Sequence, residues 1–220
     1  KCEVSLYCKK VLIDSEPKNL FPEWLRFVKG VIDSADIPLN ISRESMQDSA
    51  LVKKLGRVVL KRFLKHLADI AKKDTAKYDM FFKKFGVFLK EGAAVDFENR
   101  TELTKLLRFE SSLYADGTKV SLDDYVSRMK DGQTEIYYAC GADRKTIESA
   151  PYIEAFAARG LEVLYLYEPI DTFLVGNLGS YSEKPFASVD SDVKLGDAPK
   201  PADGEAIPEE ALKSLKDWIK

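Results

Sequence analysis

One apolar stripe limits the folds open to this sequence more than any other feature. Between Arg43 and Lys73 the hydrophobic residues recur at steps of three and four, which is the spacing of one face of an α-helix. A helix over this range would be about 45 Å long, so neighbouring elements have to pack along it. The residues of the stripe are Leu51, Leu55, Val58, Val59, Phe63, Leu67 and Ile70.

The rest of this predicted helix is basic. No acidic residue occurs between Leu51 and Ala68, whereas six lysines and arginines do. Such a face is typical of a solvated helix surface, but it could also bind RNA or an acidic protein partner. The cations do not alternate with aromatic residues as in a base-stacking surface, so the solvated interpretation is favoured. The cations are Lys53, Lys54, Arg57, Lys61, Arg62 and Lys65.

The residues before the long helix are apolar and aromatic. Val4–Ile13 is rich in β-branched residues and predicts a strand that ends before Pro17. The stretch FPEWLRFVKGVI then has near-helical spacing, which predicts a helix. Its aromatic row of Phe21, Trp24 and Phe27 is typical of a packed core, with a binding surface for other proteins as the alternative.

Two further helices are predicted before the rhythm changes. One runs over 75–90 and is ended by Gly92. The next begins near Asn99, whose side chain could cap it with Glu102 three residues on. The segment SSLYADGT, residues 111–118, is predicted to be a loop between two parts of the chain.

The second part of the sequence alternates strands with helices. Ser121 and Asp124 indicate a helix start. The stretches EIYYAC and LEVLYLY are predicted to be strands. The helix predicted between them, over 144–159, should break at Pro151. A short helix, IDTFLVGNL, and a third strand, PFASV, follow. Alternation with short connections predicts a mainly parallel sheet between helices. Gly141 follows the first strand, where α/β folds can bind ligands, although a plain turn is favoured.

The composition excludes several classes of site. With a net charge of −2 and a pI of about 5.7, the whole chain is not suited to binding nucleic acid. The sequence contains neither common glycine-rich nucleotide motif. Its three cysteines have no metal-binding spacing, which favours a reducing compartment. Its one histidine, His66, lies in the helical pattern among lysines. All methionines are internal, so we expect the sequence to be part of a longer chain.

The stretch IPLNISRESMQ, residues 37–47, places an arginine at a predicted helix start. Ser42 reads as the N-cap, and Arg43 then lies where unpaired N–H groups and the positive helix end disfavour a cation. Arg43 and these N–H groups could together bind an anion, since guanidinium donors suit phosphate. Asn40 and Gln47 add amides nearby. An ion pair with a neighbouring acid is the alternative.

These residues resemble a known family. GVIDSADIPLNISRESMQ and the preceding FPEWLRFVKG resemble the middle segment of the heat shock protein 90 chaperones. The resemblance continues, in the same order, through NRTELTKLLRFESS, SLDDYVSRMKDGQTEIYYACG and LEVLYLYEPIDTF, and covers about residues 6–189. DSALVKKL and LLRFESSL look most like the mitochondrial, TRAP-type member.

The resemblance implies an ATP-driven, homodimeric chaperone that acts in protein folding and the stress response. Arg43 would reach the γ-phosphate of ATP, bound with Mg²⁺ on an N-terminal domain outside this sequence. Asn40, Ser42 and Gln47 would belong to the same catalytic loop. Partners would be that ATPase domain, a C-terminal dimerisation domain and unfolded clients, with neither nucleic acid nor membrane involved. The fragment alone would not hydrolyse ATP, and the compartment would be the mitochondrial matrix, with the cytoplasm as the alternative.

Together these observations predict an α/β (α+β) fold in four parts. Residues 1–42 would hold one strand and one helix of a truncated first α/β subdomain, ending in the catalytic loop. Residues 43–112 would form a three-helix connecting bundle, and 113–195 a small α/β/α subdomain with a three-stranded, mainly parallel sheet. Residues 196–220 would be a linker and a helix towards the dimerisation domain. We also expect the strand over 4–13 to have an unpaired, apolar edge.

Overall fold

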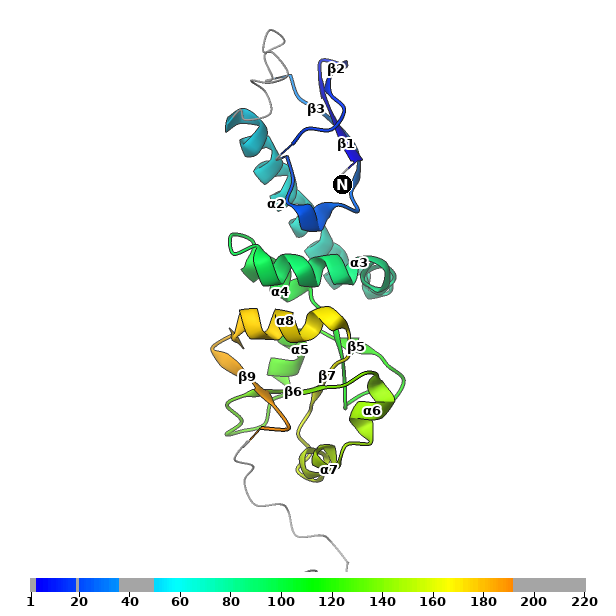
Figure 1. The fold of residues 1–220 in the computed structure, drawn as a ribbon, viewed down its shortest axis with the longest axis vertical. Helices are drawn as coiled ribbons and strands as arrows, with labels where there is room; N and C mark the ends of the chain where they lie inside the picture. Colours follow the sequence, from blue (N-terminus) through cyan, green and yellow to red (C-terminus); the bar gives the residue numbers. More distant parts are fainter. Residues whose placement is uncertain (1–2, 19, 36–49, 192–220) are drawn as a thin grey trace, which may run out of the picture.

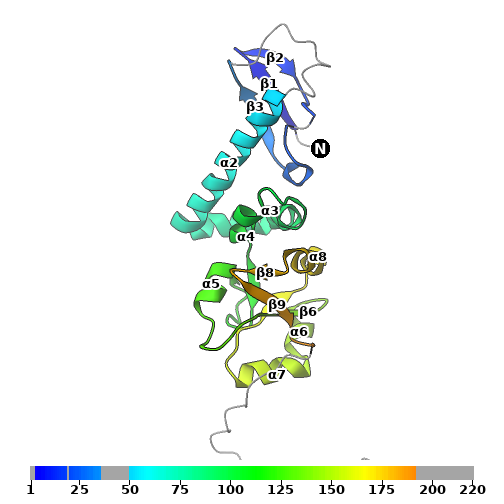
Figure 2. The same cartoon turned by 90° about the vertical axis from the view of Figure 1, so that its left-hand side faces the viewer.

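The computed structural model describes residues 3–18, 20–35 and 50–191. They form three tiers stacked along the long axis of the molecule (Figures 1 and 2). The upper tier is a small sheet with a 3-10 helix, the middle tier is a group of helices, and the lower tier is a second sheet between helices. This confirms the predicted mixed α/β class.

The upper tier is built on a three-stranded sheet. Its elements are β1 (Glu3–Cys8), β2 (Val11–Asp14), η1 (Glu23–Leu25) and β3 (Lys29–Asp33). The strand order is β2-β1-β3, in which β1 is antiparallel to β2 and parallel to β3.

The single strand predicted over 4–13 is wrong, because the chain reverses at Lys9 and Lys10. Both residues have positive φ, 48° and 68°, as the two-residue turn of a hairpin requires. Among the described residues, the predicted unpaired, apolar edge is wrong for residues 4–8, since β1 is central and β2 and β3 form the edges. It is confirmed for residues 11–13, which lie in the edge strand β2, with Val11 53% and Leu12 44% exposed. The exposed apolar side chains lie on those edges, with Val31 of β3 69% exposed.

The helix predicted from FPEWLRFVKGVI is wrong as well. Only the short η1 forms, and the chain then continues as β3, pairing from Lys29 to Asp33 with β1. β-branched Val31 and Ile32 suit a strand, and the ladder with β1 satisfies backbone groups that an isolated helical turn would leave unpaired. Pairing over this distance in the sequence therefore overrides the local spacing.

The middle tier contains α2 (Ala50–Lys73), α3 (Thr75–Val95) and α4 (Arg100–Leu106). The predicted long helix is confirmed over 50–73, and its first predicted residues lie outside the described ranges. Its buried stripe lies one position after the predicted one as far as Leu64, passes through a glycine and coincides with the predicted one at Leu67. The buried residues are Val52, Gly56, Leu60, Leu64 and Leu67.

Two predicted helix ends in this tier are corrected by packing. α3 does not end at Gly92 but continues to Val95. Gly92 allows a close approach, because a Cβ there would lie 2.7 Å from the ring of Trp24. Asn99 precedes α4 but makes no side-chain cap. Its side-chain amide instead donates to both carboxylate oxygens of Asp96, at 3.1 and 3.0 Å.

The lower tier holds a six-stranded sheet in the order β5-β4-β7-β6-β9-β8. The central strands β7, β6 and β9 are parallel, as predicted, and the other three are antiparallel additions at the edges. The sequence prediction missed those three short strands, two of which have only two residues. The strands are β4 (Phe109–Ser111), β5 (Lys119–Val120), β6 (Ile136–Cys140), β7 (Leu164–Leu166), β8 (Ser180–Tyr181) and β9 (Lys184–Ser188).

Helices cover both faces of this sheet. Side chains alternate along each strand, so Ile136 and Leu164 share a core with α5 and α8, whereas Tyr137 and Tyr165 share one with α6 and α7. This confirms the predicted α/β/α layering, the break at Pro151 and the capping box of Ser121 with Asp124. The helices are α5 (Leu122–Ser127), α6 (Arg144–Glu148), α7 (Pro151–Ala158) and α8 (Pro169–Leu178).

The described residues form three hydrophobic clusters, one of which is the cluster between the lower sheet and α6 and α7 described above. A large cluster runs without interruption from Trp24 through α2, α3 and α4 into the α8 face of the lower sheet. The upper sheet has its own small cluster, made of Val4, Leu6, Cys8, Leu20 and Val52. The division of the chain at residues 42, 112 and 195 stays a prediction.

Candidate functional site

The four residues predicted to form the anion-binding loop lie outside the described residues. They are Asn40, Ser42, Arg43 and Gln47. The structure does describe the elements on either side, β3 before them and α2 after them. Both elements reach the upper end of the molecule (Figure 1), so the frame of this segment can be described.

The exit from β3 is fixed by two hydrogen bonds. The backbone N–H of Ser34 donates to the carbonyl of Tyr7, at 3.0 Å. The carboxylate of Asp33 accepts from the backbone N–H of Lys10, also at 3.0 Å. The chain therefore leaves the sheet beside the hairpin turn that carries Lys9 and Lys10, both of which are exposed.

The described start of α2 packs on the same small core as the sheet. Val52 is buried with Leu6 of β1, and half-buried Leu51 and Leu55 lie against the same cluster as Ile32 of β3. The two ends of the segment between β3 and α2 are therefore held by one group of apolar contacts.

A glycine brings α2 close to the upper tier. A Cβ on Gly56 would lie 2.0 Å from the carbonyl oxygen of Leu20, far inside van der Waals contact. Glycine is the residue that permits such an approach of helix and backbone. The position of α2 relative to the sheet is thereby determined by backbone contact as well as by side-chain packing.

The described flanks of the segment are rich in positive charge. Lys9 and Lys10 are exposed at the hairpin turn, and Lys53 and Lys54 are exposed near the start of α2. No acidic residue occurs in the first described turn of that helix. Such surroundings raise the local concentration of anions.

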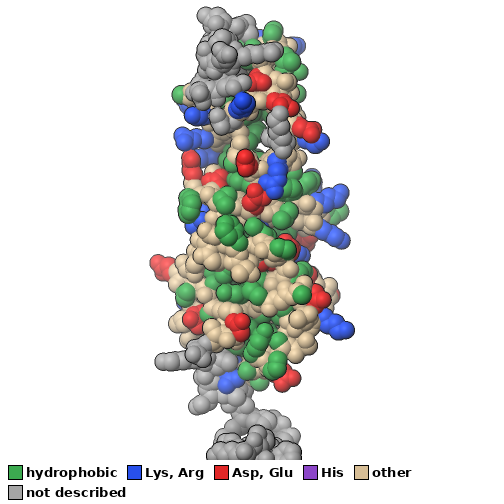
Figure 3. All heavy atoms as spheres, in the orientation of Figure 1, with side chains coloured by type: hydrophobic (Ala, Val, Ile, Leu, Met, Phe, Trp, Pro, Cys, Tyr) green, Lys and Arg blue, Asp and Glu red, His purple; other side chains and the backbone are tan. Residues whose placement is uncertain are grey.

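The basic face predicted on the long helix is exposed throughout. All six of its cations are solvent-exposed, as is His66, and Arg57 forms an ion pair with Glu98, at 3.5 Å. In Figure 3, Lys and Arg side chains gather beside α2 and α3, and fewer occur over the lower tier.

The aromatic row divides between two environments. Trp24 is 1% exposed, and its indole N–H donates to the Asp96 carboxylate at 3.0 Å. Phe27 stacks on Phe85 and Phe88, with ring centroids 4.7 and 5.1 Å apart. Phe21 is half-buried. The structure thus favours the core interpretation for Trp24 and Phe27, while Phe21 lines a cleft.

The other sequence candidates have structural explanations. A Cβ on Gly141 would lie 2.6 Å from Cγ1 of Ile147, which accounts for glycine in this turn without a ligand. Among residues 3–18, 20–35 and 50–191, no group of acids, cysteines and histidines could hold a metal ion. In the same ranges, no helix is long and apolar enough to cross a membrane.

Sequence reasoning missed the most exposed large hydrophobic residue of the described ranges. Phe97 is 76% exposed, just after α3, with the Arg100 guanidinium 4.1 Å from the centre of its ring. The sequence feature that could have indicated the exposure of Phe97 is its position between Asp96 and Glu98, outside the apolar stripes of α3 and α4. The buried Lys90 of α3 was also missed, because a single lysine in a helix gives no sign of burial.

These tiers, with the segment that contains Arg43 framed between β3 and α2, define a multi-tier α/β module with exposed lysines at one end. A family model described as "Hsp90 protein" matches residues 1–220. The chain therefore belongs to the Hsp90 family.

The relatives come from bacteria and from mitochondria. The chain is 49% identical to the chaperone protein HtpG of Desulfitobacterium hafniense, over 99% of this chain and 36% of the relative. It is 41% identical to the mitochondrial heat shock protein 75 kDa of Bos taurus, over 99% and 32%. The mitochondrial TNF receptor-associated protein 1 homolog of Dictyostelium discoideum is 47% identical, over 86% and 27%. The chain thus spans about a third of the length of the relatives it matches.

Proposed function

We propose that this chain is the middle segment of an Hsp90-family chaperone and completes the ATPase site of another domain through Arg43. One observation supports this most directly: β3 and α2 are anchored on one small core and frame the segment that contains Arg43. Membership of the family makes ATP the anion to test first.

The role of Arg43 follows from guanidinium chemistry. ATP with Mg²⁺, held by the N-terminal domain of the parent chain, supplies the phosphoryl group. Arg43 donates hydrogen bonds to the γ-phosphate oxygens and offsets the charge that develops there during transfer. Asn40 and Gln47 donate from their amides on either side, and Ser42 caps the helix that presents the arginine.

The proposed partners are those of a chaperone protomer. They are the N-terminal ATPase domain and the C-terminal dimerisation domain of the same chain, a second protomer, and unfolded or partly folded clients. The compartment is the mitochondrial matrix, a proposal supported by the mitochondrial relatives in cattle and Dictyostelium. The bacterial HtpG relatives support the cytoplasmic alternative.

Steady-state ATP turnover of the full-length parent tests the role of Arg43. We expect Arg43→Ala to lower kcat tenfold or more, equivalent to about 1.4 kcal/mol of transition-state stabilisation, and to leave nucleotide affinity nearly unchanged. Arg43→Lys keeps the charge without the planar donor fork, so it should recover only part of the rate. Unchanged turnover in Arg43→Ala would overturn the proposal.

The exposed cations of α2 support a second candidate, a non-catalytic module that binds RNA or an acidic protein. The two functions separate in a salt titration. Binding by the basic face should weaken steeply as salt rises and should not respond to Arg43→Ala. Charge removal at Lys61 and Lys65, both exposed on α2, would abolish such binding without lowering ATP turnover.

A further inference from the structure

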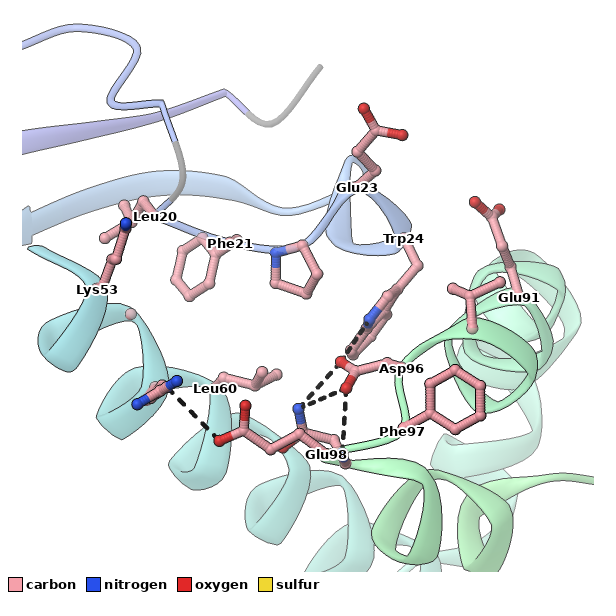
Figure 4. Close-up of a pocket in the computed structure, with 15 residues that line it drawn as sticks. Leu20, Phe21, Glu23, Trp24, Lys53, Leu60, Glu91, Asp96, Phe97 and Glu98 are labelled. Carbon is pink, nitrogen blue, oxygen red and sulfur yellow. Dashed lines mark hydrogen bonds and ion pairs between the residues drawn. The ribbon is translucent and has the colours of Figure 1, made fainter. Parts of the chain in front are cut away.

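A cleft of about 900 Å³ opens between the upper and middle tiers. Its walls come from the segment 20–24, from α2 between Lys53 and Leu60, and from the end of α3 with the turn that follows it (Figure 4). This volume lies at the upper end of the range of ligand pockets.

The floor of the cleft is held rigidly. The Asp96 carboxylate accepts from the indole of Trp24, at 3.0 Å, and from the backbone N–H of Asn99, at 3.1 Å. Gly56 and Gly92 let α2 and α3 approach the segment 20–24 more closely than a Cβ would permit. A cleft with walls fixed in this way loses little conformational entropy when it binds a ligand.

Apolar groups lie at one side of this cleft. Phe97 is 76% exposed and Val95 is 49% exposed, and both line it. The guanidinium of Arg100, which stacks on Phe97, holds the ring in place. An exposed, immobilised aromatic ring beside a cleft is a suitable anchor for a hydrophobic side chain.

The charges around the cleft are asymmetric. Four carboxylates line it, those of Glu23, Glu91, Asp96 and Glu98, against the two cations Lys53 and Arg57. Arg57 already pairs with Glu98, and Glu91 with Arg26 from outside the cleft, at 2.7 Å.

One of these carboxylates is available to a ligand. The Glu23 side chain has no hydrogen bond or ion pair with any described residue. Glu23 is one of the lining residues, and Figure 4 shows its carboxylate on the outer side of η1, pointing away from Leu60 and Asp96. The electrostatic field at that end therefore favours a cationic group.

We propose that this cleft binds an extended segment of unfolded polypeptide in which a hydrophobic side chain lies next to a lysine or arginine. The hydrophobic side chain packs on Phe97 and Val95, and the basic one lies at Glu23. This inference rests on the proposed chaperone function and names a client surface for it. The apolar anchor of this surface is Phe97. Trp24 and Phe27, the earlier candidates, pack in the core.

Peptide binding to the full-length parent tests the inference. The probes are a short fluorescent peptide of leucines and arginines and the same peptide with glutamates for arginines, followed by anisotropy. Phe97→Ala should weaken the basic peptide about fivefold or more. The control Met80→Ala removes a 65% exposed side chain of α3 outside the cleft and should leave Kd unchanged.

A charge reversal tests the electrostatic half of the inference. Glu23→Lys should weaken the basic peptide and strengthen the acidic one. Glu154→Lys, on an exposed position of α7 in the lower tier, should do neither. Variants that keep the wild-type melting temperature but bind both peptides with unchanged Kd would overturn the inference.

The two proposals fail separately. If Arg43→Ala lowers ATP turnover while Phe97→Ala leaves peptide binding intact, the proposed function stands and the client cleft is wrong. If Phe97→Ala and Glu23→Lys change peptide binding while Arg43→Ala leaves turnover intact, the cleft stands without the ATPase role.

Discussion

The ammonium of Lys90 on α3 lies 2.6 Å from a carboxylate oxygen of Asp171 on α8, and each side chain is only 2% exposed. Glu168 reaches the same ammonium at 3.1 Å, and the ring of Phe109 lies 4.9 Å from it. An ion pair therefore joins the middle and lower tiers inside the large core. Burial raises the pKa of the Asp171 carboxyl, although the charge of Lys90 opposes the rise.

Removal of one partner from this pair should be costly. Lys90→Met leaves Asp171 charged, buried and without its cation, and we expect a loss of about 3–5 kcal/mol in the free energy of unfolding. The double variant Lys90→Met/Asp171→Leu removes both charges and should be more stable than the single one. Urea unfolding of the three proteins measures this, and a single variant within 1 kcal/mol of wild type, roughly the value of a surface pair, would contradict it.

The cost of Lys90→Met should depend on pH. A carboxyl with a pKa raised by folding contributes stability that is present below its unfolded value and is lost as pH rises through the folded value. Without Lys90 the pKa of Asp171 should rise further, because burial is then less opposed. The gap in stability between the variant and wild type should therefore narrow on acidification from pH 7. A gap that does not narrow would show that Asp171 stays charged.

The same substitution at two glycines should have opposite effects. Gly56→Ala places a methyl group 2.0 Å from the Leu20 carbonyl and should destabilise by more than the ~1 kcal/mol that alanine contributes in a helix. Gly176 on α8 has no atom within 4 Å of the position a Cβ would take, so Gly176→Ala should stabilise by up to about 1 kcal/mol. Thermal melts of both variants measure the difference, and equal shifts would contradict the close approach of α2.

The hairpin turn before β2 should tolerate a stabilising change. Lys9 and Lys10 both have positive φ, which costs a non-glycine residue about 1 kcal/mol or more at each position. Lys9→Asn/Lys10→Gly supplies the residues that such a turn prefers. The hydrogen bond to the Asp33 carboxylate is kept, because residue 10 donates it from its backbone N–H. We expect a rise of about 1–2 kcal/mol in unfolding free energy, and a fall would mean that the lysine side chains stabilise the turn.

Local signals in the sequence predicted the lower tier well. The Ser121–Asp124 capping box and the break at Pro151 depend on neighbouring residues alone, so pattern reasoning could place them. The upper tier was mispredicted because its structure depends on distant partners. The aromatic spacing from Phe21 to Phe27 resembles a helix, but β3 forms because β1 pairs with it. Gly92 reads as a stop signal, yet it marks the position where the ring of Trp24 packs against α3.

The candidate site was only partly predictable for a similar reason. Arg43 could be chosen because the sequence predicts a helix start there, a prediction that lies outside the described residues. Phe97 and Lys90 could not be chosen from the sequence, because the exposure of Phe97 and the burial of Lys90 result from tertiary packing. Neither residue type alone indicates the environment found here.

The separate small core of the upper sheet has a consequence for local unfolding. The cluster of Val4, Leu6, Cys8, Leu20 and Val52 is far smaller than the one that joins the other two tiers. Amide hydrogens of β1 and β3 should accordingly exchange with solvent at a lower opening free energy than those of α3 and β6, since segments with fewer buried contacts open first. We therefore expect the upper sheet to open locally before the middle and lower tiers do.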